Sequence, residues 1–153
     1  MSTIEEASID NLEELSLLFD LYRQFYRQKS DVPGVKEFLN DRFKNKESVI
    51  YVSFTEDGKL SGFVQLYPIF TTVGMKRCWL LNDLFVKKEH RKMGIARKLL
   101  DRCKKLAEET NAIGLLLETA KNNLEGNVLY PTEGFVLVDE SNFYFWKKVE
   151  VKI

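Results

Sequence analysis

Residues 81–100 have the sequence LNDLFVKKEHRKMGIARKLL, in which an apolar stretch leads into a basic turn and then a regular pattern of apolar residues. The apolar stretch predicts a strand over residues 78–86, and Gly94 marks the turn. After the turn, apolar residues recur at the spacing of one helix face: Ile95, Leu99, Cys103 and Leu106. This spacing predicts a helix to about Thr110 that buries one side. The stretch is therefore expected to form a strand, a turn and a helix.

The turn concentrates positive charge at the point where the helix begins. Six cations and Glu89 lie between Lys87 and Lys98, although the whole chain has a formal net charge of +0. Helix N-termini favour anions, and their first N–H groups have no acceptor inside the helix. Gly94 lets a ligand approach the backbone closely. The stretch therefore predicts a phosphate site, with a solvated basic surface as the alternative.

The glycine pattern narrows the class of phosphate ligand. The chain lacks Gly-x4-Gly-Lys-Ser/Thr, so it has no P-loop signature. It also lacks Gly-x-Gly-x-x-Gly; only Gly94-x-Ala96 is present, and it comes late in the chain. Nucleotide hydrolysis and dinucleotide redox chemistry are therefore both disfavoured.

The composition is that of one ordinary globular domain, expected over residues 1–153. The balanced charge argues against a general nucleic-acid binder. No apolar run approaches a membrane span, and the acidic start lacks a signal-peptide pattern, so a cytoplasmic location is expected. The spacing of two cysteines and a single histidine, His90, predicts no metal site.

The order of expected elements is a strand, helices, a hairpin, and then alternating strands and helices. The expected strands cover residues 3–8, 49–54, 60–67, 78–86 and 113–117, one starting at Gly134-Phe135, and residues 143–149. The run at 113–117 is continuously apolar, which is typical of a strand buried on both faces. The expected helices cover residues 10–27, 35–43, 94–110 and a short segment ended by Pro131. This order predicts a mixed sheet with helices on both faces.

Two sequence blocks together resemble the GNAT superfamily of acetyl-CoA-dependent N-acetyltransferases. Arg91 to Ala96 is similar to the family's cofactor motif, Arg/Gln-x-x-Gly-x-Gly/Ala. Asn123 to Phe135 is similar to Asn-x-x-Ala-x-x-Leu-Tyr-x-x-x-Gly-Phe. The resemblance implies an α/β (α+β) fold with a mostly antiparallel sheet of six to seven strands and about four helices. The small-amine branch, which includes the spermidine/spermine N-acetyltransferases, is the most similar.

The resemblance also implies which residues hold acetyl-CoA. Backbone groups of Leu84, Phe85 and Val86 are expected to pair with the pantetheine arm. Arg91 opens the loop whose N–H groups hold the pyrophosphate, and that loop comprises Lys92, Met93, Gly94, Ile95, Ala96 and Arg97. Asn123 and Gly126 are expected to line the other side of the arm. Gly126 replaces the family's usual alanine, at a helix-propensity cost of about 1 kcal/mol.

The resemblance places Tyr130 near the thioester sulfur, as the general acid for the leaving thiolate. A phenol has a pKa of about 10 and a thiol about 8.5 in model compounds, so a protonated tyrosine can supply the proton. The base is less clear, because the polyamine branch often has glutamate where this chain has Asn82. Asp83 should point to the opposite sheet face unless a bulge re-aims it. Glu118 is a second candidate, and a relay through water is expected.

The acceptor amine is expected near Asn82 and an aromatic wall of Tyr22, Phe25 and Tyr26, because aromatic faces suit cationic amines. Packing in the core is the alternative for these rings. The acceptor is expected to be a small primary amine, and Phe143–Trp146 could form a core or a homodimer interface. Two other functions stay open, namely a non-catalytic acetyl-CoA-binding module and a protein or peptide N-acetyltransferase.

Overall fold

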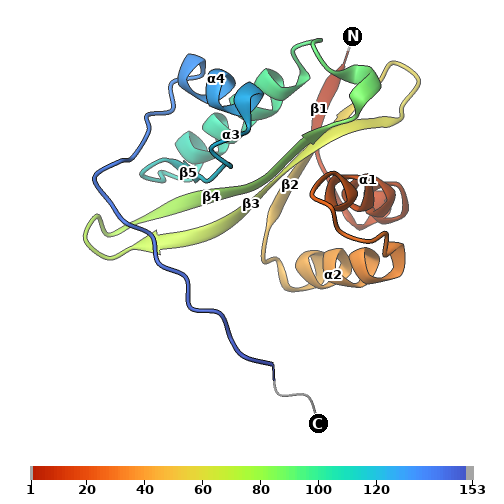
Figure 1. Cartoon of the computed structure of the whole chain (residues 1–153). Coiled ribbons are helices and arrows are strands. Elements are labelled where there is room, and N and C mark those ends of the chain that lie inside the picture. Colours follow the sequence, from red (N-terminus) through yellow and green to blue (C-terminus); the bar gives the residue numbers. More distant parts are fainter. Residues whose placement is uncertain (1, 151–153) are drawn as a thin grey trace. The chain divides into compact units, whose positions relative to one another are not determined.

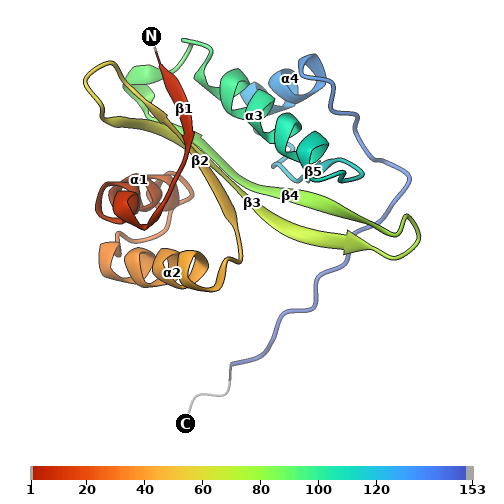
Figure 2. The same ribbon diagram turned by 180° about the vertical axis from the view of Figure 1, so that it is seen from behind.

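A computed structural model describes residues 2–150 of the 153-residue chain. The chain divides into two compact units, Met1–Glu118 and Thr119–Ile153. The first unit holds the sheet and three of the helices, and the second holds the helix α4 (Leu124–Thr132). Figures 1 and 2 show these elements from opposite sides.

The first unit is built on one mixed sheet with the strand order β1-β2-β3-β4-β5. The strands are β1 (Thr3–Glu6), β2 (Val49–Phe54), β3 (Leu60–Thr71), β4 (Lys76–Val86) and β5 (Leu115–Leu117). The first four pair antiparallel in sequence order, and β5 pairs parallel with Trp79–Leu81 of β4. The expected α/β class and mixed, mostly antiparallel sheet are therefore confirmed.

The expected number of strands was wrong for the described residues, which form five strands and not six to seven. Neither the segment after Gly134 nor residues 143–149 forms a strand there. Aromatic and β-branched residues favour strands only when a neighbouring strand supplies hydrogen bonds and packing. The run at 113–117 also differs from the expectation, because β5 covers three half-buried residues at a sheet edge and is not buried on both faces.

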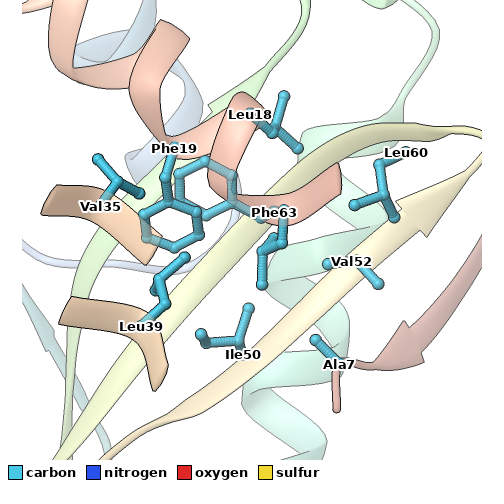
Figure 3. Packing of buried hydrophobic residues seen from close by; sticks show 10 residues of the cluster. Ala7, Leu18, Phe19, Val35, Leu39, Ile50, Val52, Leu60 and Phe63 are labelled. Atoms are coloured by element: carbon cyan, nitrogen blue, oxygen red, sulfur yellow. The ribbon is translucent and has the colours of Figure 1, made fainter. Parts of the chain in front are cut away.

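Two helices cover one face of the sheet, as Figures 1 and 2 show. These are α1 (Leu12–Phe25), which follows a short 3₁₀ turn at Ile9–Asn11, and α2 (Val32–Asn45). Figure 3 shows the core that they form with the sheet: Ala7, Leu15, Leu18, Phe19, Val35, Leu39, Ile50, Val52, Leu60 and Phe63. Phe19 stacks on Phe63 with ring centroids 3.8 Å apart. This packing fixes α1 against β3.

The opposite face of the sheet is covered by α3 (Ile95–Glu109). The helix buries the residues expected from its spacing: Ile95, Leu99, Cys103 and Leu106. Arg102 of α3 lies over the ring of Tyr51 in β2, 4.5 Å from its centroid. The strand, turn and helix predicted for residues 81–100 are thus present as β4, a turn that includes the 3₁₀ segment Lys88–His90, and α3.

A buried carboxylate holds the connection between α1 and α2. Asp20 is 4% exposed and accepts hydrogen bonds from the Asp31 N–H, the Ser30 hydroxyl and the Gln24 amide at 2.7, 2.7 and 2.9 Å. Burial alone would raise the pKa of Asp20, but these hydrogen bonds and the Arg23 charge outweigh it and lower the pKa. Asp31 caps α2 through the Gly34 N–H. Both acids therefore organise the connection between α1 and α2.

Asp20→Asn is expected to destabilise the fold by about 2 kcal/mol at pH 7, because hydrogen bonds to a charged group each contribute about 1.5–3 kcal/mol. Because folding lowers the pKa of Asp20, its carboxylate stabilises the folded state at pH values above the unfolded-state pKa, which is near 3.9. This stabilisation is lost as the pH falls through the folded-state pKa. Urea unfolding from pH 7 to pH 2.5 should therefore show the variant's deficit shrinking in acid. A constant deficit at every pH would contradict this role.

Candidate functional site

A bulge in β4 determines which face of the sheet the Asp83 side chain lies on, a point that could not be predicted from the sequence. Leu81 pairs with Leu66 and Asp83 pairs with Gln65, so the pairing shifts by one residue and Asn82 is the extra residue. Because strand residues alternate between faces, an extra residue re-aims all those that follow it. The Asp83 carboxylate consequently lies on the face covered by α1, where it accepts a hydrogen bond from the Tyr22 hydroxyl.

The Asp83 carboxylate is held by a short polar network. Gln65 Nε2 donates to Asp83 Oδ2 at 2.8 Å, and Asn82 Nδ2 donates to the same oxygen at 3.1 Å. Gln65 is 1% exposed and its Oε1 accepts from the Ser48 hydroxyl at 2.9 Å. Sequence reasoning missed Gln65. Its signal was a polar residue two positions after the core residue Phe63, on the same face of an otherwise apolar strand.

Aromatic rings surround this carboxylate. Tyr22 and Tyr26 pack edge to face at 5.1 Å, and Tyr22 lies 5.7 Å from Phe85 of β4. Phe25 contacts Tyr26 at 5.4 Å and is 62% exposed. The structure therefore brings together four of the residues expected at an acceptor site, although Tyr22 also packs against the core residue Phe63.

The Asp83 charge raises the pKa values of two nearby tyrosines, Tyr22 and Tyr67. Burial raises the pKa of Tyr22, and the adjacent Asp83 charge raises it further. Burial and the Asp83 charge also raise the pKa of Tyr67 on β3 to about 12. Both phenols therefore stay protonated through the neutral range, where Tyr22 can act as a donor. Tyr67 is a second residue that sequence reasoning did not select.

The strand edge beyond the bulge has no strand partner on the β5 side among the described residues. β5 pairs only with Trp79–Leu81, so Asn82–Val86 pairs with β3 alone. These residues include Leu84, Phe85 and Val86, which the family resemblance implies would pair with a pantetheine arm. An open strand edge presents N–H and C=O groups to a ligand. The arrangement fits an extended ligand that carries amides.

The turn after β4 has a left-handed backbone at two positions. Lys92 has φ +63° and Gly94 has φ +78°, and a Cβ added at Gly94 would meet nothing within 4 Å. Helix α3 begins at Ile95, so the N–H groups of Ile95 and Ala96 lie in its first turn, where helices leave backbone donors without an intrahelical acceptor. The turn therefore offers N–H donors beside open space, which suits a phosphate group.

Arg91 ties this turn to the end of β4. Its Nε donates to the Val86 carbonyl at 2.9 Å, and its guanidinium lies 5.6 Å from the ring centroids of both Phe25 and Phe85. The side chain thus connects the turn with the aromatic cluster. Its observed contacts position the turn, and none of them defines a phosphate contact.

The second unit brings Asn123, Gly126 and Tyr130 together. Asn123 Oδ1 caps α4 by accepting from the Gly126 N–H at 3.1 Å, and Asn123 Nδ2 donates to Thr119 Oγ1 at 2.8 Å. A Cβ on Gly126 would lie 2.5 Å from Asn123 Nδ2 and 3.2 Å from the Tyr130 ring. A side chain at position 126 would therefore require the Asn123 cap to shift.

Tyr130 is half-buried and its ring packs edge to face on Phe135 at 5.7 Å. The Phe135 N–H donates to the Tyr130 carbonyl at 3.0 Å, which fixes the chain after the helix. Pro131 lies inside the last turn of α4, so the helix ends one residue later than the sequence predicted. Glu118, the other predicted base, is exposed immediately after β5 in the first unit.

The family assignment follows from the sequence itself. The model of the acetyltransferase (GNAT) family matches residues 15–135. This chain belongs to the GNAT family of acetyltransferases. It is therefore an acetyltransferase, and enzymes of this family use acetyl-CoA.

Individual relatives agree with this assignment. The Bacillus subtilis protein described as the uncharacterized N-acetyltransferase YhfO is 41% identical over 132 residues, which are 86% of this chain and 88% of that protein. A thialysine N-epsilon-acetyltransferase from Caenorhabditis elegans is 25% identical and is covered to 84%, over 89% of this chain. A solved structure of a probable acetyltransferase has a TM-score of 0.92 at 35% identity and covers 97% of this GNAT chain and 99% of its own.

Two other features are absent from the described residues. Among residues 2–150, no group of three His, Cys, Asp or Glu side chains could hold a metal ion. None of the described helices is long and apolar enough to cross a membrane.

Proposed function

We propose that this enzyme transfers the acetyl group of acetyl-CoA to a small primary amine, such as a polyamine or an amino acid. The observation that carries the proposal is the Asp83 carboxylate, which the β4 bulge turns into an aromatic cluster beside an open strand edge. A fixed carboxylate among aromatic faces suits a cationic ammonium group. The thialysine N-epsilon-acetyltransferase is consistent with this class of acceptor, because its description names the acetylation of an amine nitrogen.

Acetyl-CoA supplies an activated thioester, whose C–S bond breaks as the amine nitrogen bonds to the acetyl carbonyl carbon. The open edge at Leu84, Phe85 and Val86 is proposed to pair with amides of the donor, and one of its N–H groups to stabilise the carbonyl oxygen. The turn from Lys92 to Arg97 is proposed to hold its phosphates, behind Arg91. Asn123 and Gly126 are proposed to line the other side of the donor.

The acceptor must lose a proton before it can attack. An amine with a pKa of about 10.4 is free base in only about 1 part in 2,500 at pH 7. Asp83 is proposed to bind the ammonium group and to take its proton through water, with Asn82, Tyr22, Phe25 and Tyr26 around the amine. Glu118 is a second carboxylate proposed to act as a base. Tyr130 is proposed to donate a proton to the leaving thiolate.

We also propose that the enzyme works in the cytoplasm. Cys78 and Cys103 are both free thiols. Disulfides form in oxidising compartments and are rare in the cytosol, so two unpaired cysteines are consistent with this location.

Release of free thiol from acetyl-CoA tests this function. The assay should include a polyamine, a diamine, an amino acid and a peptide with a free N-terminus, each at equal concentration. The cationic small amines are expected to accelerate thiol release most. Acceleration only by the peptide would favour a peptide N-acetyltransferase, and no acceleration by any amine would contradict catalysis.

Thermal unfolding with acetyl-CoA separates failed catalysis from failed binding. Ligand at about one hundred times its dissociation constant should stabilise the fold by about 2.7 kcal/mol. A shift without any amine acetylation would identify a non-catalytic acetyl-CoA-binding module. Absence of a shift would contradict the proposed donor site itself.

Gly94→Ala is expected to weaken acetyl-CoA binding about tenfold, because a left-handed backbone costs a non-glycine residue roughly 1–2 kcal/mol and the turn relaxes away from φ +78°. Gly58→Ala is a matched control, since Gly58 also has φ +78° and open space at its Cβ. Both variants should lose similar stability, and only Gly94→Ala should lose affinity in a calorimetric titration. Equal affinities would remove the turn from the donor site.

A further inference from the structure

Gln65 is a polar residue buried in the middle of the sheet, on β3. It is 1% exposed, and the apolar residues around it in the strand, Phe63, Val64 and Leu66, are fully buried. Burying an amide costs free energy unless its N–H and C=O groups find hydrogen-bond partners. An apolar side chain could fill this position without that cost. The contacts of the amide are therefore the reason to expect a role for it.

The bulge in β4 brings two amides to one oxygen of Asp83. Because Asn82 is the extra residue, Asp83 lies opposite Gln65 in the pairing of the two strands. Side chains directly opposite each other in an antiparallel pair have Cβ atoms about 4.5–5.5 Å apart, so the register itself brings these two together. Gln65 Nε2 and Asn82 Nδ2 both donate to Asp83 Oδ2, at 2.8 and 3.1 Å. Together they fix the rotation of the carboxylate.

Ser48 fixes the orientation of the Gln65 amide in turn. This residue lies immediately before β2, and its hydroxyl donates to Gln65 Oε1 at 2.9 Å. An ionised carboxylate can only accept hydrogen bonds, so Asp83 requires the NH₂ end of the amide. The oxygen end is then left for a donor, which Ser48 provides. Each end of the buried amide thus has a suitable partner.

We propose that Gln65 is a positioning residue for acetyl transfer, which holds the Asp83 carboxylate toward the aromatic cluster. This role rests on the proposed function, in which Asp83 binds the ammonium group of the acceptor and takes its proton. The amide is uncharged, so it orients the carboxylate and leaves its negative charge for a cationic amine. An arginine at the same place would form an ion pair with Asp83 and compete with that amine. Tyr22 donates a further hydrogen bond to the carboxylate.

Gln65→Met is expected to lower kcat/KM for a cationic amine about tenfold. Methionine keeps the length and the burial of the side chain but donates no hydrogen bond. A misplacement of about 1 Å can cost about 100-fold in rate, and a smaller loss is expected here because Asn82 and Tyr22 still hold the carboxylate. The KM for the amine should rise, and the KM for acetyl-CoA should stay that of the wild type. A variant that only folded less completely would lower kcat and leave both KM values unchanged.

Ser53→Ala is the matched control for the loss of a buried hydrogen bond between β2 and β3. The Ser53 and Ser61 hydroxyls are fully buried and lie 2.7 Å apart, and neither of them contacts Asp83. This variant should lose stability and keep the amine kinetics of the wild type.

A double-mutant cycle with Asp83→Asn tests whether Gln65 acts through Asp83. Asp83→Asn alone is expected to lower kcat/KM about 100-fold, and two independent effects would multiply to about 1,000-fold. If Gln65 only positions Asp83, the double variant should stay near 100-fold. A loss of about 1,000-fold in the double variant, or wild-type amine kinetics in Gln65→Met, would overturn the proposed role.

The same variants separate failure of this role from failure of the proposed function. If Asp83→Asn keeps the wild-type kcat/KM, the proposed acceptor site is wrong, and the role of Gln65 is wrong with it. If Asp83→Asn is impaired and Gln65→Met is not, only the role of Gln65 is wrong.

Circular dichroism should show that all the variants fold. If Gln65→Met does not fold, Ser48→Ala decides, because it removes only the hydroxyl that orients the Gln65 amide. Loss of this hydrogen bond is expected to lower kcat/KM for the amine about threefold in the wild-type background, and to have no effect in the Asp83→Asn background. Unchanged amine kinetics in Ser48→Ala, or the same threefold loss in both backgrounds, would overturn the proposed role.

Discussion

Replacing Tyr130 with phenylalanine is expected to lower kcat about 10²–10⁴-fold at neutral pH, the usual contribution of a positioned general acid. The expected loss follows from the proposed proton transfer, since phenylalanine keeps the ring and removes only the hydroxyl group. The edge-to-face contact with Phe135 at 5.7 Å should persist, so the fold should be retained. Steady-state kinetics with saturating acetyl-CoA give the measurement.

Comparing kcat with the affinity for acetyl-CoA and the unfolding temperature distinguishes a general-acid tyrosine from a structural one. Tyr130→Phe should leave the affinity for acetyl-CoA and the unfolding temperature close to those of the wild type. Tyr144→Phe is a matched control on an exposed tyrosine of the same unit and should not change kcat. If kcat of Tyr130→Phe stays within about threefold of the wild type, too little for a positioned acid, Tyr130 is not the acid.

Asp83→Asn is expected to lower kcat/KM for a cationic amine about 100-fold, or about 2.7 kcal/mol, because breaking a desolvated charge pair typically costs 2–5 kcal/mol. Asparagine keeps the size of the side chain and can still bond to Gln65, whose amide can turn over. The defect should therefore appear in the amine kinetics and not in acetyl-CoA binding. Initial rates over a range of amine concentrations give the value.

Raising the pH separates recognition from proton removal in this variant. If Asp83 takes the proton, a higher pH should restore kcat of Asp83→Asn as more free amine becomes available, whereas KM should remain high. Asp101→Asn, which changes an exposed carboxylate on α3, serves as the control. Wild-type kcat/KM in Asp83→Asn would show that the acceptor binds elsewhere.

Much of the fold could be predicted because its signals are local. The spacing from Ile95 to Leu106 and the single Gly94 were sufficient to predict α3 and the turn before it. The alternation of strands and helices was sufficient to predict the mixed sheet. These features depend on residues close in sequence, where periodicity and turn preferences carry the information.

The remainder depended on partners that the sequence does not specify. The direction of Asp83 follows from the pairing of β4 with β3, because the shift between Gln65 and Leu66 makes Asn82 a bulge. From the sequence one could say that a bulge would re-aim Asp83, but not whether the bulge is present. Phe143–Val149 has strand propensity, yet a strand also requires hydrogen bonds from a neighbouring strand, and residues 143–149 form no strand in the described part of the chain.

Gly126 is an example of a residue whose surroundings could not be predicted from the sequence. The helix-propensity cost of this glycine could be stated from the sequence. The two side chains that crowd the position could be seen only in the structure. A Cβ at this position would come within 2.5 Å of the Asn123 amide nitrogen and 3.2 Å of the Tyr130 ring, so the capping side chain would have to shift.

Mass detection of the product in a competition reaction shows which amine the enzyme acetylates. Wild-type enzyme and acetyl-CoA would be incubated with an equimolar mixture of a diamine, a polyamine, an amino acid and a free-amine peptide. We expect a small amine to gain one acetyl group, and we expect this product to fall sharply with both Tyr130→Phe and Asp83→Asn. Acetylation of the peptide alone, or of none of the amines while acetyl-CoA binds, would contradict the proposed function.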